Sequence, residues 1–159
     1  RGFPNLSDAD WVYGGDPDTI KTTITQGRNG VMPPMAAALG TADDVKNVAN
    51  HVLSLSGSRH DAAAAAAGRE KFAVCAACHG EAGTGNPALG APNLTDRTWL
   101  YGGSLATIVE TIERGRSNQM PAFGQMLSEG KIHLLAAYVW SLSNGPADRA
   151  TAGAAAKTN

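Results

Sequence analysis

The chain has 159 residues with a formal net charge of −1, and only 6% of its residues are aromatic. This near-neutral balance excludes the strongly basic proteins that bind nucleic acid. No stretch reaches the roughly 18 apolar residues of a membrane span, and the start "RGFPNLSDAD" lacks the pattern of a signal peptide. We therefore expect any membrane anchor to lie upstream of these residues. The two cysteines are too close together in sequence to staple a fold, so no disulfide framework is predicted.

One phrase occurs twice in the chain. "PNLSDADWVYGG" begins at Pro4 and "PNLTDRTWLYGG" begins at Pro92, an offset of 88 residues (92 − 4). The similarity continues to Ser56 in the first copy and to Ser143 in the second. Self-similarity of this length predicts two copies of one structural unit. Each copy is small and poor in aromatic residues, so we expect something other than side chains to fill part of its core.

Apolar spacing predicts helices in both copies. "DPDTIKTTITQGR" and "SLATIVETIERGR" each read as a short helix stopped by glycine, and "DDVKNVANHVLSLS" and "KIHLLAAYVWSLS" each read as a longer one. Asp61 is placed to cap a further helix in which Phe72 is the expected core anchor. No strand-like alternation is found, and the Gly/Pro segments 80–93 and 119–125 are expected to be loops.

The segment Cys75-Ala76-Ala77-Cys78-His79 carries the most specific chemistry. Its spacing lets two thiols at the end of a helix add to the two vinyl groups of one haem, with the histidine binding the iron. A thioredoxin-like thiol pair is one alternative, but it expects a parallel βαβ context. Zinc is another, but it needs a second pair of ligands. A covalently attached haem c is therefore the predicted cofactor.

An electron-carrying haem needs a second axial ligand, and a thioether is suited to that position. Met120 follows His79 by 41 residues (120 − 79), in the Pro/Gly loop "NQMPAFG". Met32, in "GVMPPM", occupies the same point of the first copy. We predict both as axial ligands; the alternative is that each fills a gap in an apolar core.

Other repeated residues are candidates for contact with the haem. Arg28 and Arg116 precede the two methionine loops, where a guanidinium can pair with a propionate; a solvated helix end is the alternative. Trp99 and Tyr101, like their first-copy counterparts Trp11 and Tyr13, are candidates to pack along the haem edge, with plain core packing as the alternative.

The segments "GREKFAVCAACHG", "APNLTDRTWLYGG" and "MPAFG" resemble class I cytochromes c. Gly68 and Phe72 look like that family's N-terminal helix, and Leu135 and Tyr138 look like its partner on the C-terminal helix. The doubled W(V/L)YGG phrase resembles the dihaem subunit family (CcoP, subunit III) of cbb3-type cytochrome c oxidases. The resemblance, over residues 1 to about 143, implies an all-α fold of two tandem class I cytochrome c-like domains, the first N-terminally truncated. The expected boundaries are 1–57, lacking its CxxCH segment, 58–143, and a flexible tail 144–159.

The resemblance also implies a function and a setting. Cys75 and Cys78 would attach one haem, and His79 and Met120 would ligate its iron. Met32 would serve a second haem, expected in the intact protein, whose attachment cysteines would precede Arg1. The chain would have no catalytic site of its own. It would relay electrons from a donor cytochrome c or cytochrome bc complex to the catalytic and monohaem subunits of a terminal oxidase.

The same resemblance places the chain on the periplasmic side of a bacterial inner membrane, attached through an upstream anchor. Two other functions stay open at this point. One is a free dihaem electron carrier, and the other is a dihaem peroxidase, in which one iron would have to lose its sixth ligand.

Overall fold

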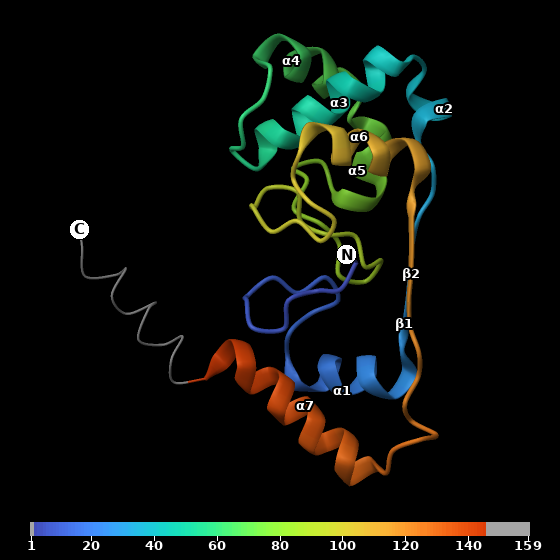
Figure 1. Cartoon of the computed structure of the whole chain (residues 1–159), viewed down its shortest axis with the longest axis vertical. Coiled ribbons are helices and arrows are strands. Elements are labelled where there is room, and N and C mark those ends of the chain that lie inside the picture. Colours follow the sequence, from blue (N-terminus) through green and yellow to red (C-terminus); the bar gives the residue numbers. More distant parts are fainter. Residues whose placement is uncertain (1, 146–159) are drawn as a thin grey trace, which may run out of the picture. The chain divides into compact units, whose positions relative to one another are not determined.

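The computed structural model describes residues 2–145 of the chain. Within this range the fold is mostly helical, with one small two-stranded sheet (Figure 1). The elements run in this order along the chain: α1 (Pro17–Gln26), β1 (Arg28–Met32), α2 (Ala36–Leu39), α3 (Ala42–Leu55), α4 (Ala62–Lys71), α5 (Ala73–His79), α6 (Leu105–Arg114), β2 (Arg116–Met120) and α7 (Glu129–Asn144).

The two sequence copies form the same local structures. Asp16 caps α1 by accepting a hydrogen bond from the backbone of Thr19, and Ser104 caps α6 in the same way. Gly27 and Gly115 end these helices with φ of 71° and 68°, in the left-handed region that glycine reaches without steric cost. The predicted short helices are therefore confirmed, and the repeat extends to their caps.

The two strands correct the expectation of a wholly helical fold. β1 and β2 are hydrogen-bonded neighbours and run side by side in Figure 1. Their sequences, "RNGVM" and "RSNQM", are short and polar, so they carry no alternation that would predict a strand. They become strands because each copy supplies the other with a matching partner.

The described residues form two compact units, and these do not coincide with the two sequence copies. Unit 1 comprises residues 2–3 and 29–119, and unit 2 comprises residues 4–28 and 120–145. Each unit thus combines part of one copy with part of the other. The boundaries expected from the repeat, 1–57 and 58–143, remain a prediction about the sequence copies. The expected tail lies outside the described residues from 146 onward, while Asn144 still belongs to α7.

In unit 1, α4 packs along α3. At Gly68 the helices approach so closely that a Cβ atom would collide with the backbone of Asn47 and lie 2.7 Å from the Val48 nitrogen. Four residues on, Phe72 is buried, as predicted, and meets the His51 ring edge-on with centroids 4.9 Å apart. The core around this contact consists of Leu39, Val45, Val48, Ala49, Val52, Leu53, Phe72, Ile108 and Ile112.

In unit 2, α1 packs against α7 around a smaller core. Its buried members are Ile20 and Ile24 of α1 and Ile132 and Ala136 of α7. An exposed ion pair of 3.1 Å joins Lys21 to Glu129 across the same two helices. Ion pairs exposed to water in this way add little stability, so the apolar contact between the helices is the main source of their association.

The partner expected for Gly68 and Phe72 was wrong. Leu135 and Tyr138 of α7 are exposed to 41% and 62%, whereas the equivalent face of α3 covers α4. The physical reason is that α3 and α7 are copies of one helix, so either can accept the small residue and the aromatic ring of α4. The fold uses α3, from the first copy.

Candidate haem site

The CxxCH segment forms helix α5 in unit 1. Cys75 and Cys78 are both free thiols three residues apart, which places them on the same side of the helix. Burial, and secondarily the neighbouring Cys78, raise the pKa of the Cys75 thiol. A redox-active pair needs a thiol of lowered pKa, so this environment argues against the thioredoxin-like alternative. Cys75 packs against the apolar core and Cys78 is exposed, an arrangement compatible with attachment of a haem at this edge of the unit.

His79, the last residue of α5, is buried and held in a defined orientation. Its Nδ1 lies 2.8 Å from the backbone carbonyl oxygen of Pro92. A carbonyl can only accept a hydrogen bond, so Nδ1 is the donor, and in the neutral ring this tautomer has its lone pair on Nε2. Such a bond on the far nitrogen is how a ligating histidine is normally oriented towards its metal. This contact leaves Nε2 as the nitrogen available to a metal, and iron ligation by His79 remains a prediction.

The loop that brings Pro92 to His79 is folded tightly on itself. Gly85 donates its backbone N–H to the His79 carbonyl oxygen at 2.8 Å, and Leu94 donates to Gly83 at 2.7 Å. Gly85 has a φ of 85°, and a Cβ there would lie 2.7 Å from the Ala91 oxygen. Only glycine satisfies both conditions. The loop sequence thus fixes the carbonyl that orients the histidine.

The structure separates the two candidate methionines. Met32 packs against the buried core of unit 1, as do Cys75 and Ala76 of the CxxCH helix. Met120 belongs to unit 2 and is 36% exposed. His79 and Met120, the predicted pair of ligands, therefore lie in different units, whereas His79 and Met32 lie in the same unit.

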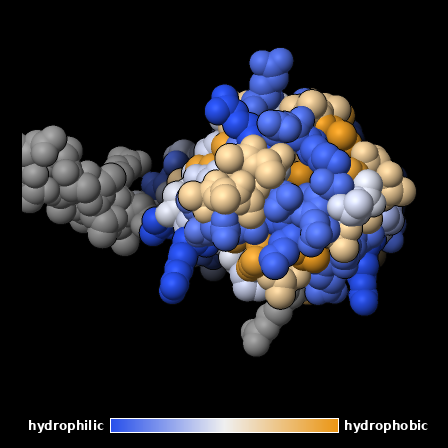
Figure 2. All heavy atoms as spheres, turned by 90° about the horizontal axis from the view of Figure 1, so that it is seen from above, coloured by the Kyte–Doolittle hydropathy of each residue, from blue (hydrophilic) through white to orange (hydrophobic). Residues whose placement is uncertain are grey.

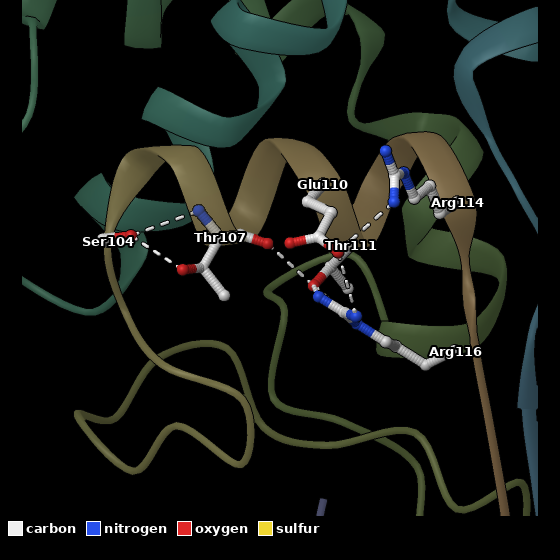
Figure 3. Close-up of polar contacts among 6 residues, drawn as sticks. All are labelled: Ser104, Thr107, Glu110, Thr111, Arg114 and Arg116. Atoms are coloured by element: carbon white, nitrogen blue, oxygen red, sulfur yellow. Dashed lines mark hydrogen bonds and ion pairs between the residues drawn. The ribbon is translucent and has the colours of Figure 1, made fainter. Parts of the chain in front are cut away.

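Arg116 is held by three neighbours in unit 1. Its guanidinium carbon lies 4.4 Å from the centre of the Tyr101 ring, and its Nε and Nη2 donate to the Thr111 hydroxyl at 3.0 and 2.7 Å. The Glu110 carboxylate lies 3.7 Å from the Arg116 guanidinium, and Figure 3 shows Arg116 beside Glu110 and Thr111 of α6. These contacts fix the direction of the guanidinium. Its predicted pairing with a propionate remains a prediction.

Arg28 repeats this arrangement in unit 2. It lies 4.6 Å from the centre of the Tyr13 ring and donates to the Thr23 hydroxyl at 2.9 Å. Sequence reasoning missed the two threonines, although both copies carry one five residues before the arginine. That shared spacing was the signal that would have found them.

The repeated tryptophans lie against the glycines that end the W(V/L)YGG phrase. A Cβ at Gly103 would lie 2.6 Å from the Trp99 indole, and one at Gly15 would lie 2.5 Å from the Trp11 indole. Trp99 also packs against the unit 1 core that Cys75 and Met32 touch. In each copy the tryptophan of the phrase therefore packs against its last glycine. Trp99 contacts the same core as Cys75.

Other features of the described residues do not compete with this site. Within residues 2–145 no cluster of three or more His, Cys, Asp or Glu side chains is suited to hold a metal ion. No helix in this range is both long and apolar enough to cross a membrane. An open hollow of about 770 Å³ in unit 1 is lined by residues of α3, α4 and α5 but by neither cysteine nor His79. Polar and apolar residues are interspersed over the described part of the face in Figure 2.

The helical fold, the CxxCH helix and the oriented histidine fit a covalently bound haem and define a cytochrome c domain. Residues 62–139 match the family model described as cytochrome c oxidase, cbb3-type, subunit III. Together with the relatives described next, this match shows that the chain is similar to the cbb3-type subunit III family.

Three curated relatives extend the similarity to about nine tenths of the chain. The subunit CcoP of a cbb3-type cytochrome c oxidase from Rubrivivax gelatinosus is 58% identical over 143 residues, covering 90% of this chain and 47% of that protein. The subunit FixP from Azorhizobium caulinodans is 48% identical and CcoP from Cereibacter sphaeroides is 45% identical, each over 155 residues, covering 91% of this chain and 53% of the relative. The chain spans about half the length of these relatives.

Proposed function

We propose that the chain is an electron-transfer component of a cbb3-type oxidase and carries a haem c on Cys75 and Cys78. The observation that carries this proposal is the hydrogen bond from His79 Nδ1 to the Pro92 carbonyl, because it leaves Nε2 as the ring nitrogen available to bind iron. The similarity to this family and the names of the relatives support the same cofactor.

The residues divide the work as follows. The two cysteines anchor the group covalently, His79 supplies one axial ligand, and a thioether from Met32 or Met120 supplies the other. Arg116, held by Tyr101 and Thr111, is the candidate for a propionate partner. When bound, haem c supplies a one-electron redox couple, and methionine ligation favours a high reduction potential.

Two protein ligands on the iron leave no open position for a substrate. We infer that this chain does not itself reduce oxygen but passes electrons onward. Its partners would be the catalytic and monohaem cytochrome subunits of the oxidase, with a donor cytochrome c or cytochrome bc complex upstream. The intact protein would carry a second haem and lie on the periplasmic side of the inner membrane, held by an anchor outside this chain. A free dihaem carrier or a dihaem peroxidase are the other outcomes to be tested.

The test is a redox titration of the chain matured with haem, combined with carbon monoxide binding to the reduced form. The proposal expects one reversible one-electron transition and no carbon monoxide adduct. A His79→Ala variant should open one axial position and bind carbon monoxide, which shows that the assay detects a vacant ligand site. Carbon monoxide binding by the parent protein would refute the electron-transfer role and favour a peroxidase. Electron delivery to a purified oxidase core would distinguish an oxidase subunit from a free carrier.

A further inference from the structure

Helix α6 carries a charge that its counterpart in the first copy lacks. The 88-residue offset aligns Glu110 with Thr22, so a carboxylate stands in the second copy where a hydroxyl stands in the first. The Glu110 carboxylate lies 3.7 Å from Nη1 of Arg116 and 4.0 Å from Nη1 of Arg114 (Figure 3). The Arg114 side chain is 77% exposed and that of Arg116 only 22%. Arg116 is therefore the partner whose attraction to Glu110 is less screened by water.

Each nitrogen of the Arg116 guanidinium has a neighbour on α6. Nε and Nη2 donate to the Thr111 hydroxyl oxygen at 3.0 and 2.7 Å, and Nη1 faces Glu110. The Thr111 oxygen is free to accept these bonds because its own proton is donated to the Thr107 carbonyl oxygen at 2.8 Å. The Tyr101 ring covers the guanidinium, with its centre 4.4 Å from the guanidinium carbon. The orientation of the charge is therefore fixed.

The first copy shows that the carboxylate is not needed to hold the arginine. Arg28 lies 4.6 Å from the centre of the Tyr13 ring and donates from Nε to the Thr23 hydroxyl at 2.9 Å. These are the same kinds of contact that hold its counterpart, although Thr22 replaces the glutamate. Glu110 thus adds a negative charge to an arrangement that aromatic and hydroxyl contacts already maintain. Its effect is expected on the charge of the arginine rather than on the fold.

Helix α6 also contributes to the core that the haem-attachment segment touches. Ile108 and Ile112, on either side of Glu110 in sequence, are buried in the unit 1 core, and Cys75 packs against that core. Arg116 is the candidate propionate partner in the same unit. A positive charge close to a haem favours the reduced iron, which carries one positive charge fewer, and so raises the reduction potential. A carboxylate that offsets this charge lowers the potential.

We propose that Glu110 is a positioning residue that lowers the reduction potential of the haem on the CxxCH helix. It acts through Arg116, by offsetting the guanidinium charge and by holding Nη1 towards α6. The inference rests on the proposed function, and within it on Arg116 as the propionate partner. Because Thr22 carries no charge, this offset distinguishes the second copy from the first, although the two helices are otherwise equivalent.

The test is the midpoint potential of residues 1–159 matured with haem, measured by spectroelectrochemical titration at low ionic strength. Glu110→Gln removes the charge and keeps the shape of the side chain. The matched control is Glu113→Gln, which removes the same charge from another exposed glutamate of α6. Glu110→Gln should raise the midpoint potential, and Glu113→Gln should raise it much less. The melting temperature should hardly change in either variant, because exposed ion pairs add little stability. A shift in potential at unchanged stability separates tuning of the haem from a structural role.

Arg116→Gln and the double variant Glu110→Gln, Arg116→Gln complete a double-mutant cycle. Arg116→Gln alone should lower the potential, and the further change of Glu110 should then shift it much less than in the parent. An unchanged or lowered potential in Glu110→Gln, or a shift no larger than that of the control, would overturn the proposal. A shift of equal size with and without Arg116 would also overturn it.

The parent protein separates failure of this proposal from failure of the proposed function. If the parent carries covalent haem with a reversible one-electron transition, each contrary result above concerns Glu110 alone. A parent without covalent haem would instead overturn the proposed function, and this inference with it. Equal covalent haem content in the variants shows that each has matured and that their potentials can be compared.

Discussion

Val48→Ala and Leu135→Ala form a matched test of which helix covers α4. These residues occupy equivalent positions in the two copies, but Val48 is 0% exposed and Leu135 is 41% exposed. Val48→Ala removes two buried methyl groups, about 1.6 kcal/mol at ~0.8 kcal/mol each, and a residual cavity brings the loss to about 2 kcal/mol. For a unit of this size that corresponds to a fall in melting temperature of about 10 °C.

Leu135→Ala should cost about 1 kcal/mol or less, because much of the side chain already faces water. Both variants are measured by differential scanning calorimetry and by urea denaturation at one protein concentration. Gly130→Ala is the control for unrelated changes in α7, since a Cβ there meets no atom within 4 Å and should not destabilise the chain. A larger loss for Leu135→Ala than for Val48→Ala would refute the packing of α4 on α3.

Further predictions concern the same unit. Gly68→Ala should destabilise it by about 1–3 kcal/mol in denaturant titrations, because the new methyl group meets helix backbone that cannot rotate away; unchanged stability would contradict the close crossing. Hydrogen bonds from Lys71 and Thr41 hold the pKa of Asp44 at about 2 against an ordinary 3.8, so its stabilising effect is complete above pH 3.8 and is lost as pH falls towards 2. Asp44→Asn should remove that pH dependence in acid denaturation curves. Burial, and secondarily the charge of Arg69, lower the pKa of His51 from 6.5, so the unfolded state takes up the proton first and stability falls as pH drops below 6.5. His51→Gln should flatten this slope.

Much of the local structure could be predicted from the sequence. The cap Asp61 and the stop glycines Gly27 and Gly115 carry their signals within a few residues, and the structure forms helices where those signals place them. The buried Phe72 followed from the same kind of pattern. Local chemistry decides such features, so a single sequence is enough to find them.

The pairing of helices could not be predicted, for a physical reason. A repeat shows that α3 and α7 present similar faces, so Gly68 fits either one and periodicity does not choose between them. The two strands could not be predicted for a related reason. Short, mostly polar segments such as "RNGVM" and "RSNQM" become strands only when a partner strand lies beside them. The sequence likewise identified Met32 and Met120 as candidates but could not show which of them shares a unit with His79.

Covalent haem content is the most direct test of the central claim, that Cys75 and Cys78 attach a haem c whose iron His79 binds. Residues 1–159 are expressed with the haem-attachment machinery and analysed by denaturing mass spectrometry together with the pyridine haemochrome spectrum. The parent should carry one haem per chain through two thioether bonds, and the double variant Cys75→Ala, Cys78→Ala should carry none. A properly matured parent without bound haem, or a double variant that retains covalent haem, would contradict the claim.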